Sequence, residues 1–288
     1  MQKNSLSLTW CLGAAGVFLG CAHPTSSSLA AEDRCPIVEL GETEGDCPWA
    51  LWVRNFSSLP TVVIESLALD AKDPAIHEAW GMSLNFDAGA RAEIVSRPIL
   101  QALAREFRTE LTEVDGITHQ HAGLIHTYGY LLSNLRTPFG YKRARWVSGT
   151  VDRGLGLPAE TLGPALRGAS TLLSRATFLF LKVALHQDPG AWKTWRRRLL
   201  GRVGPELDSL KLPKISRKIE KYPLQSGGFA DLITDLVALE RDPAGRRLLV
   251  YSVRRSGQVQ LITGFPVEAS FEERPGNPVR PRYNAWLE

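Results

Sequence analysis

The chain has 288 residues, of which 44% are hydrophobic and 22% are charged, as is usual for a folded globular protein. Its formal net charge is +4, but Asp and Glu are concentrated before about residue 115 and most Arg and Lys residues follow it. Beyond the N-terminal region, the sequence excludes a transmembrane helix, because even the most apolar run, residues 176–185, is short and contains Lys182.

The N-terminus has the pattern of a bacterial export signal. Lys3 precedes a charge-free apolar run over residues 6–19, which is too short to span a bilayer. The run ends in Phe18-Leu19-Gly20-Cys21, which resembles the lipobox of bacterial lipoproteins, although Phe18 departs from the usual Leu. The alternative is an ordinary secretory signal that is cut near residues 28–30.

The lipobox resemblance implies a chain in three parts: a signal peptide (1–20), a lipidated Cys21 with a flexible tether (21–33), and a globular domain (34–288). Acyl chains such as palmitate on Cys21 would anchor the protein to a membrane of the cell envelope, where we expect it to face the periplasm. In that oxidising compartment, Cys35 and Cys47 are expected to form a disulfide bond, and two free buried thiols are the alternative.

The first half of the globular region predicts few regular elements. Residues 48–56 are aromatic and β-branched and predict a strand, whereas residues 60–69 suit either a strand or a helix. Residues 70–79 predict a helix with Pro74 in its first turn. A loop over residues 80–92 then leads to a helix that begins after Ser96, its expected N-cap, and is ended by Gly116.

Half of the histidines lie between positions 119 and 126, as His119, His121 and His126. On a short strand, His119 and His121 would lie on one face, and His126 could join them across a bend. Such a cluster could bind zinc or another divalent metal and activate a water molecule for hydrolysis, with Glu113 or Asp115 as a carboxylate ligand. The alternatives are metal-free acid–base catalysis and histidines that only make structural hydrogen bonds.

The second half predicts a mixture of helices and strands. The predicted elements are a strand or short buried helix (124–132), a strand (142–150), a loop (154–158), helices at 158–166, 170–186 (with a strand as the alternative) and 191–203, a long loop that can include a helical turn (205–222), a helix (228–240) and a hairpin (248–253 and 259–265). Asp188 is expected to cap the helix at 191–203. Because these elements do not alternate as βαβ units, we expect a single α+β domain with a mixed or antiparallel sheet.

Two groups of cations predict a surface that contacts an anionic ligand: Lys142, Arg143 and Arg145, and then Arg196 and Arg197. Both groups lie beside tryptophans, which suits phosphate contact or anchoring at a lipid interface. The alternative is a solvated helix face that covers a core-facing stripe. An anionic envelope component or a protein is therefore the expected partner, and nucleic acid is a less favoured one.

Thr263-Gly264-Phe265-Pro266 resembles the closing strand of some secreted ribonucleases, which use two histidines, a lysine and a nearby threonine. The resemblance is limited to this hairpin. The favoured hypothesis is therefore a lipid-anchored envelope protein that binds or scaffolds a partner, without identifiable chemistry. The alternative is an envelope hydrolase that uses His119, His121 and His126, either with a metal or in a metal-free, ribonuclease-like manner.

Overall fold

The structure, a computed structural model, describes residues 69–70, 73–80, 85–87, 92–94, 126, 149–159, 161–162, 169–224 and 227–271. Several predictions lie outside these residues. They concern the signal peptide, Cys21, the tether, the Cys35–Cys47 bridge, the strand at 48–56, the helix after Ser96, and the elements at 60–69, 124–132 and 142–150 except for residues 69, 126, 149 and 150.

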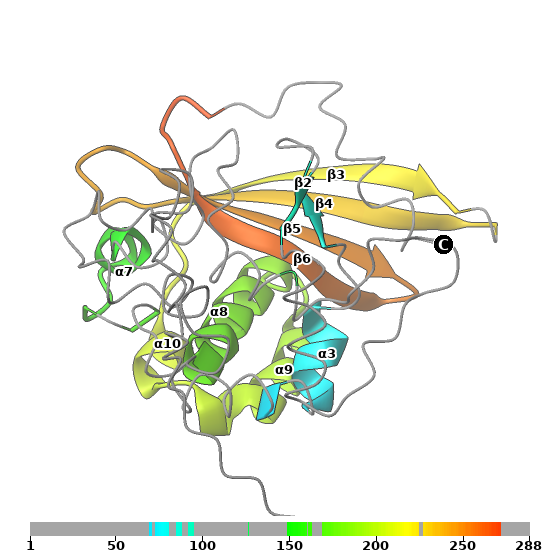
Figure 1. The fold of residues 1–288 in the computed structure, drawn as a ribbon, viewed down its shortest axis with the longest axis horizontal. Coiled ribbons are helices and arrows are strands. Elements are labelled where there is room, and N and C mark those ends of the chain that lie inside the picture. Colours follow the sequence, from blue (N-terminus) through cyan, green and yellow to red (C-terminus); the bar gives the residue numbers. More distant parts are fainter. Residues whose placement is uncertain are drawn as a thin grey trace, which may run out of the picture.

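The C-terminal part of the described chain is a four-stranded antiparallel sheet with the strand order β3-β4-β5-β6 (Figure 1). Its strands are β3 (Ile215–Pro223), β4 (Phe229–Ala238), β5 (Arg247–Arg255) and β6 (Gln258–Val267). Each strand pairs with the next one along the chain, so the sheet is a simple meander. Together with the helices, this sheet makes the described part of the chain α+β.

Several helices gather on one side of the sheet in Figure 1. The helical elements are α3 (Pro74–Trp80), α7 (Thr150–Leu155), α8 (Ala169–Ala184), α9 (Pro189–Leu199), the 3₁₀ turn η4 (Leu200–Arg202) and α10 (Pro205–Ser209). Two short strands, β1 (Phe86–Asp87) and β2 (Ala92–Glu93), pair with each other. None of the helices in the described ranges has the length and apolarity needed to cross a bilayer.

Helix α8 packs on the sheet through a close approach at Gly264 of β6. A Cβ atom at this position would lie 2.3 Å from Cζ of Phe180, so only glycine allows the aromatic ring to rest on the strand. Phe180 in turn meets the edge of Trp80 from α3, with ring centroids 5.9 Å apart. These contacts place α8 and α3 over the same part of the sheet.

The sheet is buried on both faces. Val237, Leu248 and Leu261 face the cluster that includes α8 and α9, whereas Leu249 and Phe265 belong to a second buried cluster. A strand buried on both faces reads as an almost continuous apolar run rather than as an alternation of apolar and polar residues. Strands of this sheet that are buried on both faces therefore lack the alternating pattern by which a strand is recognised in a sequence.

An ion pair joins the edge strand β3 to α8. The Arg217 guanidinium donates to both carboxylate oxygens of Asp235, at 2.6 and 2.8 Å, and the two residues are cross-strand partners. Its Nη2 also donates to the carbonyls of Val183 and Ala184, at 2.9 and 3.2 Å. These carbonyls lie at the end of α8, where a cation is favourable, so Arg217 fixes the helix against the sheet.

The predicted hairpin near the C-terminus is confirmed. β5 and β6 are joined by Ser256 and Gly257, whose φ angles are 50° and 77°. Two successive residues with positive φ form the tight turn whose twist matches that of the flanking strands. Further along the hairpin the pairing shifts, because Tyr251 pairs with Thr263 and Ser252 with Leu261, which leaves Ile262 as an extra residue in β6.

The predicted helices at 70–79, 170–186 and 191–203 correspond to α3, α8 and α9. Asp188 caps α9 as expected, because its carboxylate accepts from the Ala191 amide at 3.0 Å. In the same way, the Asp73 carboxylate accepts from the Ala75 amide at 2.8 Å, and Pro74 begins α3. The interpretation of residues 80–92 as a loop missed the short β1–β2 pair.

The predicted helix at 228–240 is wrong, because these residues form strand β4. Within residues 205–222, the short helix α10 agrees with the helical turn that the loop prediction allowed, but the rest is not a loop, because it includes most of strand β3. The apolar alternation in β3 is weak because none of its residues is buried at this edge of the sheet: five are exposed and four are intermediate.

The predictions for residues 150–166 also need correction. Residues 150–155 form α7, so Thr150 does not lie in a strand and Gly154 does not lie in a loop. Gly154 instead allows α7 to approach Leu239, whose Cβ would lie 2.6 Å from an added Cβ. Within the predicted helix at 158–166, the described residues 158–159 and 161–162 are not helical, and the Asp152 carboxylate accepts from the Leu162 amide at 2.9 Å.

Candidate functional site

Helix α9 combines a core-facing aromatic stripe with a series of cations. Trp195 is buried, and Trp192 meets the edge of Phe178 from α8 with ring centroids 4.9 Å apart. The stripe holds the helix in place and turns the intervening basic residues outward. Together with η4, the helix carries the cations Lys193, Arg196, Arg197, Arg198 and Arg202.

Three of these cations have carboxylate partners. Arg196 makes a two-pronged contact with Asp208 of α10, with both nitrogen–oxygen distances at 2.5 Å. Arg198 pairs with Glu78 of α3 and lies over the Trp195 ring, 5.2 Å from its centroid. Arg202 pairs with Asp73 and lies 3.7 Å from Asp70. These pairs connect α9 and η4 to α10, to α3 and to the residues just before α3.

Lys193 and Arg197 differ from their neighbours. Both are exposed, and neither has an ion pair within the part of the chain that the structure describes. They are four residues apart, which places them on the same face of the helix. Arg197 is therefore available for the anion contact predicted for it, whereas the guanidinium of Arg196 is already bound to Asp208.

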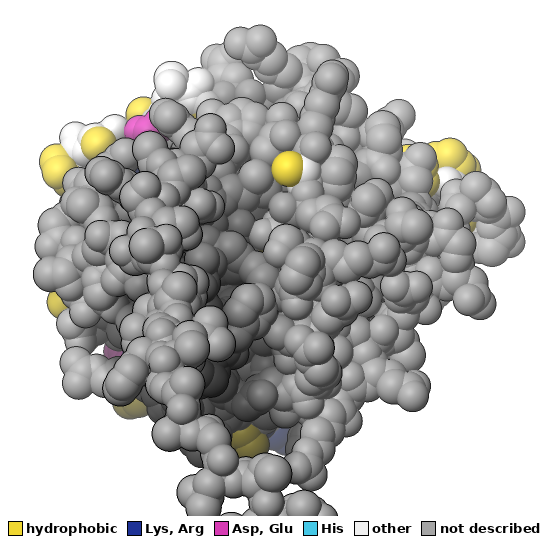
Figure 2. All heavy atoms as spheres, viewed as in Figure 1, with side chains coloured by type: hydrophobic (Ala, Val, Ile, Leu, Met, Phe, Trp, Pro, Cys, Tyr) yellow, Lys and Arg dark blue, Asp and Glu magenta, His cyan; other side chains and the backbone are white. Residues whose placement is uncertain are grey.

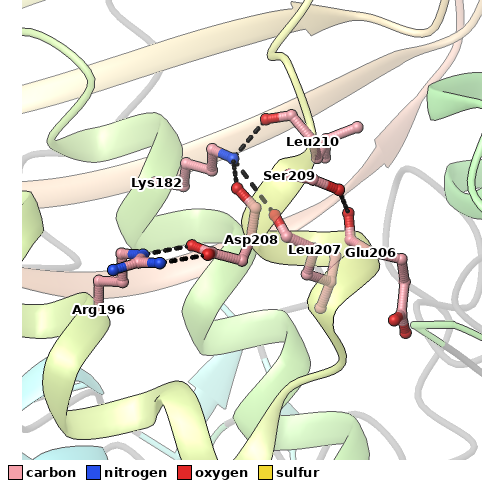
Figure 3. A network of polar contacts seen from close by, with 7 residues as sticks. All are labelled: Lys182, Arg196, Glu206, Leu207, Asp208, Ser209 and Leu210. Carbon is pink, nitrogen blue, oxygen red and sulfur yellow. Dashed lines mark hydrogen bonds and ion pairs between the residues drawn. The ribbon is translucent and has the colours of Figure 1, made fainter.

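A polar network connects α8, α9 and α10 (Figure 3). The Lys182 ammonium donates to the carbonyls of Leu207 and Asp208, at 3.2 and 2.9 Å, and to that of Leu210. These groups lie at and just beyond the end of α10, where carbonyls lack helical partners. Lys182 thus interrupts the apolar run of α8 in order to cap α10.

The electrostatics of the network follow from its geometry. Burial lowers the pKa of Lys182, and the negative charge of Asp208 partly offsets this effect. The hydrogen bonds from Arg196 lower the pKa of Asp208 below its ordinary value of 3.8. The network therefore contains an ionised carboxylate between two cationic groups. Because Lys182 directs its N–H groups at carbonyls, the geometry suits a structural cap rather than a nucleophile.

We expect Asp208→Asn to reduce the dependence of stability on acidic pH. Because the folded-state pKa of Asp208 is depressed, its contribution is present above the unfolded-state pKa and is lost as the pH falls through the folded-state value. The difference in unfolding free energy between wild type and variant should thus shrink below about pH 4. Denaturant titrations across the acidic range measure it.

Arg196→Gln provides the control, because it removes the main cause of the lowered pKa. In this variant the Asp208 carboxyl should titrate closer to its ordinary value in an NMR experiment. An unchanged titration of Asp208 in Arg196→Gln would contradict this account of the network.

The predicted histidine site is represented by a single described residue. His126 is buried and has a helical backbone, whereas His119 and His121 lie outside the described residues. No group of three or more His, Cys, Asp or Glu side chains within the described ranges could hold a metal ion. The zinc-binding and acid–base hypotheses for His119, His121 and His126 thus stay predictions.

Of the remaining predicted sites, some lie outside the described residues and others lie within them. Cys21, Cys35, Cys47, Lys142, Arg143 and Arg145 lie outside the described residues. The residues that resemble a ribonuclease strand, Thr263 to Pro266, are buried in β6. Gly264 in that segment serves the packing of Phe180.

Sequence reasoning identified the cations of α9 but not their partners. Asp208 and Glu78 lie in other elements, and no local pattern relates them to Arg196 and Arg198. A signal was present for Lys182, because a lysine within an apolar helix stripe requires buried acceptors. Comparisons with known proteins found no matching family model, no matching curated protein and no matching solved structure.

Proposed function

We propose that this chain is a lipid-anchored protein of the bacterial cell envelope that binds or scaffolds a partner at the membrane surface. The observation that carries the proposal is the N-terminal sequence, in which Lys3 and the apolar run at 6–19 lead directly into Leu19-Gly20-Cys21. Acyl chains on Cys21 would anchor the chain, and the Ser- and Thr-rich residues after it would hold the folded part away from the bilayer.

The exposed cations of α9 support a binding role. Lys193 and Arg197 are displayed on a helix that is itself fixed by the buried Trp195, the partly buried Trp192 and ion pairs to α3 and α10. A rigid scaffold of this kind can present charges to an anionic partner without losing much conformational freedom on binding.

We expect Cys21→Ala to abolish lipidation and membrane association. The full chain is expressed in a bacterium that is supplied with a clickable palmitate analogue, and the label and the membrane fraction are measured. Wild type should be labelled and should pellet with membranes after a high-salt wash. Cys21→Ala should carry no label, because it lacks the thiol that accepts the lipid at the lipobox.

Cys11→Ala is the matched control, because Cys11 lies within the apolar run and leaves with the signal peptide in this proposal. It should be labelled like wild type, and the mass of the mature protein should match a chain that starts at acylated Cys21. Label retained in Cys21→Ala, or a mature N-terminus near residue 31, would refute the lipoprotein assignment.

A further inference from the structure

A small surface at the end of α9 combines exposed apolar and basic side chains, and we call Leu69, Lys193, Arg197 and Leu200 the basic patch. Lys193, Arg197 and Leu200 follow each other at helical spacing. The segment with Leu69 is joined to η4 by the ion pairs of Arg202 with Asp70 and Asp73. Both leucines are unusually exposed for their type, at 64% for Leu69 and 45% for Leu200.

Hydrophobic and basic atoms appear together at the lower edge of Figure 2, where Figure 1 places the end of α9. Elsewhere on α9 the cations are neutralised by Glu78 and Asp208. On α9, the basic patch is thus where positive charge is uncompensated by acidic side chains of the described residues. Two exposed leucines beside this charge add apolar side chains that can enter the boundary between head groups and acyl chains.

We propose that the basic patch docks on the anionic head groups of the membrane to which the chain is anchored, an inference that rests on the proposed function. Lysine and arginine attract anionic lipids, and short apolar side chains such as leucine enter the boundary between head groups and acyl chains. The anchor on Cys21 would keep the patch at a high local concentration near the bilayer, so a weak contact suffices.

The test is lysine footprinting on the full lipidated chain in vesicles. The protein is reconstituted into phosphatidylcholine vesicles with or without a third of phosphatidylglycerol, treated briefly with an amine-reactive reagent, and analysed by mass spectrometry. Lys193 should react more slowly in the anionic vesicles, and added salt should remove the difference. Lys218 of β3 serves as the internal reference and should react equally in both.

Arg197→Gln should reduce the docking equilibrium about fivefold, because each cation near an anionic leaflet contributes about that factor. Lys221→Gln removes a cation from the sheet instead and should leave the protection of Lys193 unchanged. Equal reaction of Lys193 in both vesicles would overturn the inference. So would protection by soluble polyglutamate alone, which would indicate an acidic macromolecule as the partner.

This experiment distinguishes a failure of the lipoprotein assignment from a failure of the proposed docking of the basic patch. Intact mass of the same preparation reports the acyl chains. Acylated protein with an unprotected Lys193 would refute the basic patch and leave the lipoprotein assignment standing. Unacylated protein would refute the lipoprotein assignment, and sedimentation of that chain with anionic vesicles, compared with Arg197→Gln, would still decide whether the patch binds lipid.

Discussion

We expect Asp235→Asn to lower the free energy of unfolding by about 3–5 kcal/mol, the usual cost of breaking a buried ion pair from one side. The side chains of Arg217 and Asp235 are only 8% and 0% exposed. Removal of the carboxylate charge leaves the guanidinium uncompensated between β3, β4 and the end of α8. Chemical denaturation near neutral pH measures the loss.

The same two strands offer a matched control. Lys221 and Asp231 also form a direct cross-strand ion pair, but the Lys221 side chain is 69% exposed. Asp231→Asn should cost no more than about 1 kcal/mol, because water screens an exposed pair. Equal losses in Asp231→Asn and Asp235→Asn would contradict the importance of burial. The double variant Arg217→Met, Asp235→Leu should recover much of the stability lost in Asp235→Asn.

Gly264→Ala should destabilise the protein by about 1–3 kcal/mol, as overpacking of a core usually does. At an unhindered strand position, the same change would stabilise by reducing the freedom of the unfolded chain. Here the added methyl group would lie 2.3–2.6 Å from the Phe180 ring, which is itself confined by Trp80. Thermal unfolding of the variant measures the effect.

Two comparisons test the cause of this loss. Gly201→Ala adds a methyl group where no atom lies within 4 Å, and it should change stability by less than about 0.5 kcal/mol. In Phe180→Leu the ring is gone, and the further change Gly264→Ala should cost much less than it does in wild type. An undiminished cost in that background would rule out the clash with Phe180.

The helices α8 and α9 could be predicted from sequence for different reasons. Helix α9 has one apolar stripe and a clear boundary, whereas α8 is buried on almost all sides of its described part but forms an apolar run longer than a usual strand. In α9, Asp188 and Pro189 mark the start, and Trp192 and Trp195 mark the buried face. Such signals are local, so they can be recognised without knowledge of the surfaces that the helix packs against. The β5–β6 hairpin was equally predictable, because Ser256-Gly257 separates two β-branched runs.

Strand β4 could not be distinguished from a helix. Phe229, Leu232, Ile233 and Leu236 fall at helical spacing, but Leu232 and Ile233 are both buried because the sheet is covered on both faces. Periodicity alone does not separate the two structures in such a run. Asp235 would lie on the polar face of the predicted helix, and its burial depends on Arg217, which lies in another strand.

The candidate site was also only partly predictable, because the partners of its charged residues lie in other elements of the fold. The basic character of α9 is visible in the sequence because its cations lie close together, from Lys193 to Arg198. Which cations remain available depends on acids that lie far away in the sequence, such as Glu78 for Arg198. Sequence can therefore propose a charged surface, but the choice of Arg197 over Arg196 required the fold.

The extra residue in β6 has a consequence for how this sequence can change over evolutionary time. Because Ile262 stands between the pairs Ser252–Leu261 and Tyr251–Thr263, its loss would leave all the other pairings of the hairpin intact. If Ile262 were kept and paired in a regular register without the bulge, each later residue of β6 would face the opposite side of the sheet. Gly264 would then point away from α8, and Phe265 would point at Phe180 instead. Strand pairing therefore permits a change of length at this position, at the cost of the buried Ile262 side chain, whereas the spacing from Thr263 to Val267 should stay fixed.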